Sequence, residues 1–308
     1  MTTSDRPHKT PTAFINRRMH SLLGLWLVIY LFEHLLTNSE AALFVGYDGE
    51  GFIKMVNFIH SLPYLYIIES LFIGVPFGVH MVLGVKYLLT MKQNSYVVSD
   101  AEPKLPEYPR NHAYTWQRIT SWILIPLILL HVFQMRFLKY PETVKVGETE
   151  YHMVKVNQDE GLNTLAPRIG ITLFDPEKIT SQKSGMRGVD AVERQEYQQK
   201  EDFSNSLKSF RLGPGDAVAV SESIGTAILM NVRETFKSPL MLILYSIFLS
   251  SAVFHACNGL WTFALTWGIP LSMTGQRIIK RFALGLMALL SFLGFAAIWG
   301  SYLINLRY

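Results

Sequence analysis

Cysteine and charged residues are scarce in this sequence. The 308 residues include one cysteine, Cys257, so no internal disulfide can form, and the C-x-x-C-H motif for covalent haem attachment is absent. Charged residues make up 17% of the chain, whereas soluble domains have about 25%. A disulfide scaffold and a disordered chain are therefore excluded. The net charge of +4 does not indicate a nucleic-acid partner, because the basic residues lie between apolar runs and not on one soluble face.

Long apolar runs dominate the sequence instead. Hydrophobic residues make up 49% of the chain, and the mean hydropathy is +0.21. About 20 apolar residues are enough to cross a bilayer, and five such runs are present, at residues 20–44, 62–89, 116–138, 238–268 and 278–303. Pro76 and Pro126 lie inside two of them and are expected to kink the helices without ending them. The sequence predicts an all-α membrane protein, a five-transmembrane-helix bundle with a small extramembrane insert between the third and fourth helices.

The chain is expected to have three parts. Residues 1–140 would form the first three transmembrane helices, residues 141–236 the insert, and residues 237–308 the last two helices. The insert mixes stretches rich in valine, isoleucine and threonine with turn signals such as Gly213-Pro214-Gly215, and it also has a polar, helix-prone stretch. This composition indicates an α+β or loop-rich subdomain, and a partly ordered loop is the alternative.

Lysine and arginine near the span ends predict the orientation, because cytoplasmic loops carry an excess of these residues. The segment from Lys139 to Lys237 is too long for this rule to apply to it. Of the other connections and termini, one side has twelve such residues, and the opposite side has Lys54 and Arg307. The twelve are Arg6, Lys9, Arg17, Arg18, Lys86, Lys92, Lys104, Arg110, Arg118, Arg277, Lys280 and Arg281. We therefore expect a multi-pass protein of the cell inner (cytoplasmic) membrane, with a cytoplasmic N-terminus and with the C-terminus and insert on the outer side. No signal peptide is expected, because residues 1–18 contain no apolar core.

Four histidines, His34, His80, His131 and His255, lie inside four different spans. An ionisable side chain in the hydrocarbon region is costly, so each histidine marks a candidate functional site. A helix rises about 1.5 Å per residue, which places His34 and His131 in the outer half of the membrane and His80 and His255 in the inner half. The sequence thus predicts two pairs at two depths.

Two imidazoles from facing helices are the axial ligands of a six-coordinate b-type haem. A glycine follows His80 and His255 by four residues, at Gly84 and Gly259, and leaves a patch without side chains on the same helix face where a porphyrin can lie. A zinc site is less favoured, since two histidines per level leave its tetrahedral shell incomplete. For any single histidine, the plain alternative is a hydrogen-bonded core residue.

The motifs around these histidines resemble a known family, the di-haem cytochrome b membrane anchor subunits of bacterial succinate dehydrogenases. The resemblance covers the five spans and fails over residues 142–233, where that family has a short connection. Its most specific part runs from His255 to Gly268. The matching stretches are Arg17-Arg18-Met19-His20-Ser21-Leu22-Leu23-Gly24, His34-Leu35, Ser61-Leu62-Pro63, His80 with Gly84-Val85, Gln117-Arg118, Phe254-His255-Ala256-Cys257-Asn258-Gly259-Leu260-Trp261, Thr266-Trp267-Gly268 and Gln276-Arg277.

The resemblance implies an electron-transfer subunit of succinate:quinone oxidoreductase, a respiratory complex shared with the tricarboxylic acid cycle. It implies two haems b. His80 and His255 would hold the iron of the haem nearer the cytoplasm, and His34 and His131 the iron of the distal haem. Electrons would pass from a cytoplasmic iron–sulfur subunit, itself joined to a flavoprotein subunit, to a membrane quinone, for which menaquinone is expected. Succinate chemistry would occur in those partners, because nothing in this chain resembles a flavin fold or a cysteine cluster.

Five further residues are candidates for binding roles. Arg17, Arg18 and His20 stand at the inner membrane edge, where cations can hold haem propionates or face an acidic partner. Positive-inside anchoring is the alternative for the two arginines. His60 and Glu69 lie near the outer end of the second span and are candidates for a quinone site, because a quinone head group needs proton donors and acceptors near the electron source. An interfacial histidine and a carboxylate at a helix start are the alternative.

Two other functions stay open at this point. A free-standing di-haem quinol oxidoreductase would bind the haems without a stable iron–sulfur partner. A haem-free proton-relay protein would need a chain of carboxylates in the membrane, where Glu33 and Glu69 are the candidates.

Overall fold

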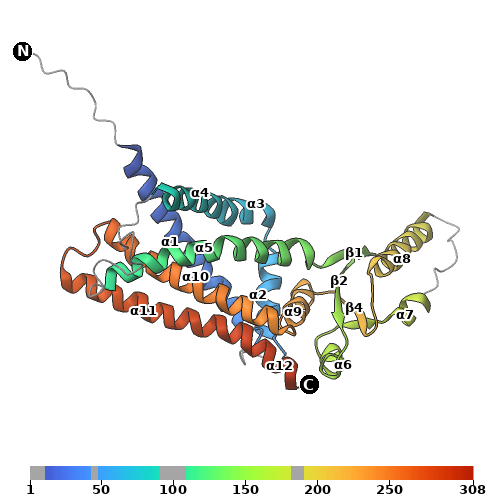
Figure 1. The fold of residues 1–308 in the computed structure, drawn as a ribbon. Helices are drawn as coiled ribbons and strands as arrows, with labels where there is room; N and C mark the ends of the chain where they lie inside the picture. The colour runs from blue at the N-terminus through green and yellow to red at the C-terminus, as the bar shows by residue number, and fades with distance from the viewer. Residues whose placement is uncertain (1–10, 43–47, 91–108, 182–190, 308) are drawn as a thin grey trace, which may run out of the picture. The chain divides into compact units, whose positions relative to one another are not determined.

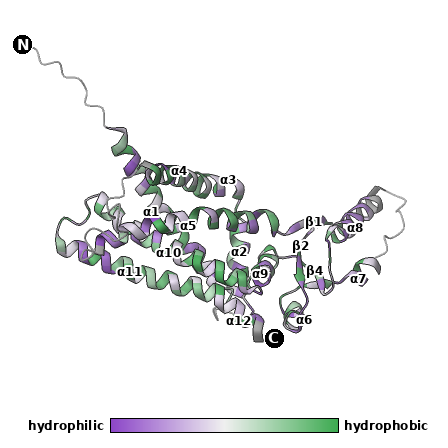
Figure 2. Cartoon of the chain, in the orientation of Figure 1, coloured by the Kyte–Doolittle hydropathy of each residue, from purple (hydrophilic) through white to green (hydrophobic). Residues whose placement is uncertain are grey.

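The computed structural model describes residues 11–42, 48–90, 109–181 and 191–307. Within these ranges, five helical spans are long and apolar enough to cross a membrane: Thr12–Ser39, Leu65–Leu89, Arg110–Leu138, Pro239–Thr266 and Met273–Asn305. Figure 2 shows hydrophobic residues along these helices and hydrophilic residues along α8 (Ala191–Ser209) of the insert. The predicted all-α membrane bundle is confirmed, and the chain is a multi-pass membrane protein. Arg6, Lys9, Lys92 and Lys104, which support the predicted orientation, lie outside the described residues.

Two of the spans are single helices, and the other three contain a π-helical segment. The single helices are α1 (Thr12–Ser39) and α10 (Pro239–Thr266). The second span consists of α3 (Leu65–Glu69), η1 (Ser70–Gly74) and α4 (Val75–Thr90); the third of α5 (Pro109–Val132) and η2 (Phe133–Leu138); the fifth of α11 (Met273–Phe295), η3 (Ala296–Gly300) and α12 (Ser301–Arg307). A further helix, α2 (Glu50–His60), lies between the first two spans.

Neither transmembrane proline ends its span. Pro126 lies inside α5, and Pro76 is the second residue of α4, directly after the π-helical segment η1. Because proline has no N–H, Pro76 cannot donate to the carbonyl of Phe72 four residues earlier. The indole of Trp26 on α1 donates to this carbonyl from Nε1 at 2.6 Å. A neighbouring helix thus supplies the hydrogen bond that proline removes, as backbone in lipid requires.

The chain divides into two compact units. The first contains Met1–His34, Tyr66–Ile125 and Ser250–Ser291; the second contains Leu35–Leu65, Pro126–Leu249 and Phe292–Tyr308. The first unit contains parts of α1, α4, α5, α10 and α11 (Figure 1). The second unit contains the insert together with α2, α12 and the adjoining ends of the spans. The expected division at residues 141 and 236 stays a prediction.

An antiparallel sheet forms the centre of the insert in the second unit. In the described part of the insert, the strands pair in the order β1-β2-β4-β3. The elements are β1 (Glu142–Val146), β2 (Thr149–Asn157), α6 (Glu160–Arg168), β3 (Thr172–Phe174), α7 (Pro176–Ser181), α8 (Ala191–Ser209), β4 (Asp216–Ser221) and α9 (Ile224–Thr235). On one face of the sheet, Met153, Val218 and Val220 are buried beneath Leu207 of α8 and Ile179 of α7. Helix α9 packs on β2 and β4 and covers the other face (Figure 1).

Helix α9 also joins the insert to α2. A Cβ on Gly225 would lie 2.5 Å from the carbonyl oxygen of Ile53, so only glycine permits this approach. Asn57 of α2 accepts a hydrogen bond at Oδ1 from the backbone N–H of Gly225 at 2.8 Å, and its amide donates to Ser223, the N-cap of α9, at 3.0 Å. The start of α9 is therefore held by side chains from outside the insert.

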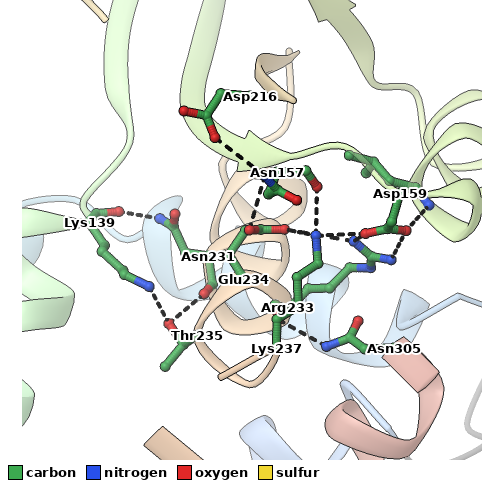
Figure 3. Close-up of polar contacts among 11 residues, drawn as sticks. Lys139, Asn157, Asp159, Asp216, Asn231, Arg233, Glu234, Thr235, Lys237 and Asn305 are labelled. Atoms are coloured by element: carbon green, nitrogen blue, oxygen red, sulfur yellow. Dashed lines mark hydrogen bonds and ion pairs between the residues drawn. The ribbon is translucent and has the colours of Figure 1, made fainter. Parts of the chain in front are cut away.

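A polar cluster around Asp159 joins the sheet to the end of α9 (Figure 3). Arg233, whose side chain is 9% exposed, donates to both carboxylate oxygens of Asp159, at 2.8 and 2.6 Å. Lys237 contacts the same carboxylate at 2.6 Å, and the backbone N–H of Leu162 donates to it at 2.7 Å. Burial raises the pKa of the Asp159 carboxyl, but the hydrogen bonds from Arg233, Lys237 and Leu162 outweigh burial and hold the pKa well below its usual range. The amide of Asn305 in α12 donates to the Arg233 carbonyl at 3.0 Å.

Candidate functional site

Three histidines come together in the first unit. His20 of α1 stacks on His80 of α4, with ring centres 4.1 Å apart and planes inclined by 13°. The ring centres of His80 and of His255 on α10 are 6.4 Å apart, and these planes are nearly perpendicular, at 84°. Two imidazoles bound through nitrogen to opposite sides of one metal, with bonds of about 2 Å, would have a similar separation. The predicted pair His80 and His255 therefore has nearly perpendicular ring planes and a centre-to-centre spacing that two ligands of one metal would also have.

The hydrogen bonds of these rings determine which nitrogen carries the proton. Nδ1 of His80 lies 3.0 Å from the carbonyl oxygen of His20, which can only accept, so Nδ1 is the donor. Nδ1 of His255 lies 3.3 Å from the hydroxyl of Ser121, which donates its own hydrogen to the carbonyl of Gln117 at 2.7 Å. The Ser121 hydroxyl must therefore accept from His255. In both rings Nε2 carries the lone pair, as an imidazole ligand to a metal requires.

Glycines lie close to this histidine group. A Cβ on Gly84 would lie 3.4 Å from Nε2 of His20, and a Cβ on Gly259 would lie 3.9 Å from the amide nitrogen of Gln117, an ordinary contact. A third glycine, Gly24, is closer still, because its Cβ would lie 3.0 Å from Cε1 of His80. Sequence reasoning did not assign a role to Gly24, although it follows His20 by the same four residues that separate the other two histidine–glycine pairs.

Amide side chains fix the backbone near His255. Gln117 of α5 donates to the carbonyl of His255 at 3.2 Å, and Asn258 of α10 donates to the Gln117 side chain at 2.7 Å. Asn258 also donates to the carbonyl of Ala113 at 3.4 Å. These bonds link α5 to α10 at His255 and at the residue three positions after it. Gln117 and Asn258 belong to stretches that carry the family resemblance, but their function as a link between the helices required the structure.

The other predicted pair is divided between the two units. His34 belongs to the first unit, where its ring centre lies 5.6 Å from that of Tyr30. His131 belongs to the second unit, at the end of α5, and its Nδ1 lies 3.2 Å from the hydroxyl of Tyr245 on α10. Tyr245 in turn donates to the side-chain oxygen of Gln134 at 3.2 Å. The pairing of His34 with His131 stays a prediction.

The two candidate quinone residues also belong to different units. His60, the last residue of α2, lies in the second unit with its ring centre 6.4 Å from that of Tyr140. Glu69, the last residue of α3, lies in the first unit within electrostatic range of Tyr30. A shared role of His60 and Glu69 therefore stays a prediction. Tyr140 was not among the sequence candidates.

Arg17 and Arg18 differ in their surroundings. The guanidinium of Arg18 lies 4.5 Å from the ring centre of Phe14 and 5.1 Å from that of Trp267, while Arg17 is exposed. Trp267 donates from Nε1 to the hydroxyl of Ser21 at 2.9 Å. Each such cation–π contact stabilises by about 0.5–1 kcal/mol at an exposed site. Arg18 thus links the start of α1 to the residue that follows α10, and propionate binding by either arginine stays a prediction.

The described residues include no group of three or more histidine, cysteine, aspartate and glutamate side chains that could hold a metal ion by themselves. This finding is compatible with a haem held by two histidines, because a six-coordinate haem iron takes only two ligands from the protein.

Three buried polar atoms in the described part of the first unit have no hydrogen-bond partner: the hydroxyls of Tyr87 and Thr115 and the indole nitrogen of Trp261. All three groups can donate a hydrogen bond. The ring centre of Tyr87 lies 5.4 Å from that of His20.

The chain is similar to a curated protein over nearly the whole length of both. The succinate dehydrogenase cytochrome b558 subunit of Bacillus subtilis (strain 168) is 27% identical over 287 residues, which cover 93% of this chain and 96% of that protein. The chain is a homologue of that subunit. This finding confirms the resemblance drawn from the histidine-containing motifs. No family model matches the chain, and no solved structure matches it.

Proposed function

We propose that the chain is the membrane anchor and electron-transfer subunit of a succinate dehydrogenase. It carries two b-type haems and passes electrons from a cytoplasmic iron–sulfur subunit, joined to a flavoprotein subunit, to membrane menaquinone. The chain itself does not act on succinate. The single observation that supports this function best is the pair His80 and His255, whose rings lie 6.4 Å apart with Nδ1 of each held by an acceptor.

The residues near His80 fit a haem in three respects. Nε2 of both histidines has the lone pair needed for iron, and the acceptors at Nδ1 orient the rings, as they do for metal-binding histidines in general. Gly259, four residues after His255, has no side chain, and the one atom within 4 Å of a Cβ there is the amide nitrogen of Gln117 at 3.9 Å. The hydroxyl of Tyr87, buried and without a partner beside His20, suits a carboxylate acceptor such as a haem propionate.

Bound haem supplies one-electron redox chemistry, and the residues of this chain determine where it is held. His80 of α4 and His255 of α10 would hold the haem iron through their ring nitrogens. Gln117 and Asn258 keep α5 and α10 in register beside His255, which preserves the hydrogen bond from His255 to Ser121. The apolar residues of the spans exclude water from the site. By the same proposal, His34 and His131 hold the second haem.

The orientation belongs to the same proposal. The N-terminus faces the cytoplasm, where Arg17, Arg18 and His20 would lie near the partner subunits and the haem propionates. The C-terminus and the insert lie on the outer side of the cytoplasmic membrane. His60 and Glu69 would then serve the quinone site, on the side where the distal haem lies.

The test is a reduced-minus-oxidised visible spectrum of the purified chain, with a measured ratio of haem to polypeptide. Two low-spin haems are expected per chain, and the variant His255→Ala should lose the haem nearer the cytoplasm. His112→Ala is a control, because His112 is a histidine at the start of α5 with no proposed role. A wild-type chain without haem would refute the proposal, and so would two intact haems in His255→Ala. Copurification with a flavoprotein separates an anchor subunit from a free-standing quinol oxidoreductase.

A further inference from the structure

The hydroxyl of Tyr245 has a defined direction in its hydrogen bonds within the second unit. It lies 3.2 Å from Nδ1 of His131 and 3.2 Å from the side-chain oxygen of Gln134, to which it donates. A tyrosine hydroxyl has one hydrogen, so toward His131 it can only accept. Nδ1 of His131 must therefore carry the proton, and Nε2 the lone pair.

Gln134 is placed by the π-helical segment η2, which begins one residue after α5 ends. The side chain is buried, at 6% exposure, so its amide oxygen needs a donor from within the protein. Its backbone oxygen accepts from the N–H of Lys139 at 2.9 Å, five residues later, as a π-helical turn requires. The wider turn thus gives Gln134 a fixed backbone from which its side chain reaches Tyr245.

Aromatic packing holds the Tyr245 ring independently of its hydroxyl. The ring packs edge-to-face with Phe236, at 5.3 Å between centres, and with Phe248, at 6.2 Å. Phe248 also packs against His131 at 5.5 Å. Replacement of Tyr245 by phenylalanine would keep these contacts and remove only the hydrogen bonds, which makes it a specific probe of the hydroxyl.

We propose that Tyr245, held by Gln134, is a positioning residue that fixes the tautomer of His131 and lowers the reduction potential of the haem that His131 ligates. This inference rests on the proposed function, because it needs a haem at His131. A hydrogen bond from Nδ1 makes the imidazole a more basic ligand. A more basic ligand stabilises ferric iron more than ferrous iron, so the potential falls. The equivalent acceptor for His255 is the hydroxyl of Ser121, at 3.3 Å from Nδ1.

The experiment compares Tyr245→Phe with the wild type in the intact complex, by potentiometric titration of the haem bands and by electron paramagnetic resonance of the low-spin ferric signals. We expect the potential of one haem to rise. A tenfold change in the ferric-to-ferrous preference corresponds to about 59 mV for one electron. The low-spin signal of the same haem should shift, and the other haem should stay as in the wild type. Tyr302→Phe is the matched control, because Tyr302 also packs edge-to-face on an aromatic ring, that of Trp299.

Gln134→Leu is the second variant and keeps the inference testable if Tyr245→Phe does not assemble. It leaves the tyrosine but removes the acceptor that directs its hydrogen, so the same haem should change potential. Unchanged potentials and signals in the variants that assemble would overturn the inference, as would an equal shift in Tyr302→Phe. A wild-type chain with two haems and an unaffected Tyr245→Phe refutes only the role of Tyr245. A wild type without haem refutes the proposed function.

Discussion

The variant Gly259→Ala distinguishes a chain that binds a porphyrin at this glycine from one that does not. Alanine should stabilise the protein alone, but it should weaken the binding of a porphyrin. A Cβ at this position meets one atom within 4 Å, the amide nitrogen of Gln117 at 3.9 Å, so alanine fits the protein without a clash. Replacing a glycine inside a helix by alanine stabilises the helix by about 1 kcal/mol. Packing within the protein therefore predicts that Gly259→Ala raises stability, with about a fivefold gain in the folding equilibrium.

If a porphyrin lies over this glycine, Gly259→Ala should instead destabilise the haem-bound protein. Non-bonded carbon atoms pack at about 3.5–4.0 Å, so a ring in contact with the Gly259 backbone leaves no room for a methyl group. Overpacking of this kind costs about 1–3 kcal/mol, which lowers haem affinity by roughly 5- to 150-fold. The assay is the haem content per polypeptide during titration with haem, together with the thermal unfolding midpoint of the purified chain.

The control is Gly285→Ala in α11, where a Cβ would meet nothing within 4 Å. This control should show the gain in helix stability and no loss of haem. If Gly259→Ala binds haem as tightly as the wild type and gains the same stability as Gly285→Ala, no porphyrin lies on this face of α10.

Three further predictions follow from the contacts described above. Ser121→Ala removes the acceptor at Nδ1 of His255 and should weaken haem binding by about 10- to 100-fold. Ser301→Ala is its control, because the Ser301 hydroxyl donates to the carbonyl of Ala297 in the same span; equal haem affinities of the two variants in a titration would contradict the prediction. Asp159→Asn should destabilise the insert by about 3 kcal/mol, because Arg233 is buried, and hydrogen exchange in β2 and α9 would report the loss. Folding lowers the pKa of Asp159, so the ionised carboxylate stabilises the fold above the unfolded pKa of about 3.9, and this stabilisation is lost as the pH falls below that value. The unfolding free energy of Asp159→Asn should therefore depend less on acid pH than that of the wild type. An unchanged pH dependence would refute the ion-pair account. Replacing residues 142–221 by a short Gly/Ser linker, with α9 kept, should leave the haem spectrum intact, whereas a linker that also removes α9 should expose α2 to proteolysis.

The lengths of the apolar runs predicted the number of membrane spans. They predicted much less of the features that depend on how each helix is rotated about its axis and on which strands and side chains pair. Five apolar runs predicted five spans, but α1 begins and ends earlier than residues 20–44, because hydropathy does not mark where a helix starts outside the bilayer. The depth of His80 and His255 could be counted along their helices. The acceptors of their Nδ1 atoms could not, because the rotation of each helix about its axis decides whether Ser121 faces His255.

Contacts between residues far apart in the sequence are the other features that could not be predicted. Strand β4 pairs with β2 across α6, β3, α7 and α8, and no local pattern indicates such a partner. Tyr245 and Gln134 lie more than a hundred residues apart, on α10 and η2, and meet only after both spans have packed. The sequence did indicate that Tyr245 and Gln134 have partners, because a polar group in the hydrocarbon region needs one. Gly24 had a signal as well, in its four-residue spacing from His20.

The hydrogen bond from Trp26 to the carbonyl of Phe72 has a consequence for biosynthesis. A backbone carbonyl without a partner in the hydrocarbon region costs several kcal/mol, and Pro76 removes the N–H that would serve Phe72 within its own helix. The donor lies on the preceding span, which leaves the ribosome first. The second span is therefore more stable in the bilayer as a hairpin with the first than alone. The order of synthesis supplies the donor before the acceptor enters the membrane.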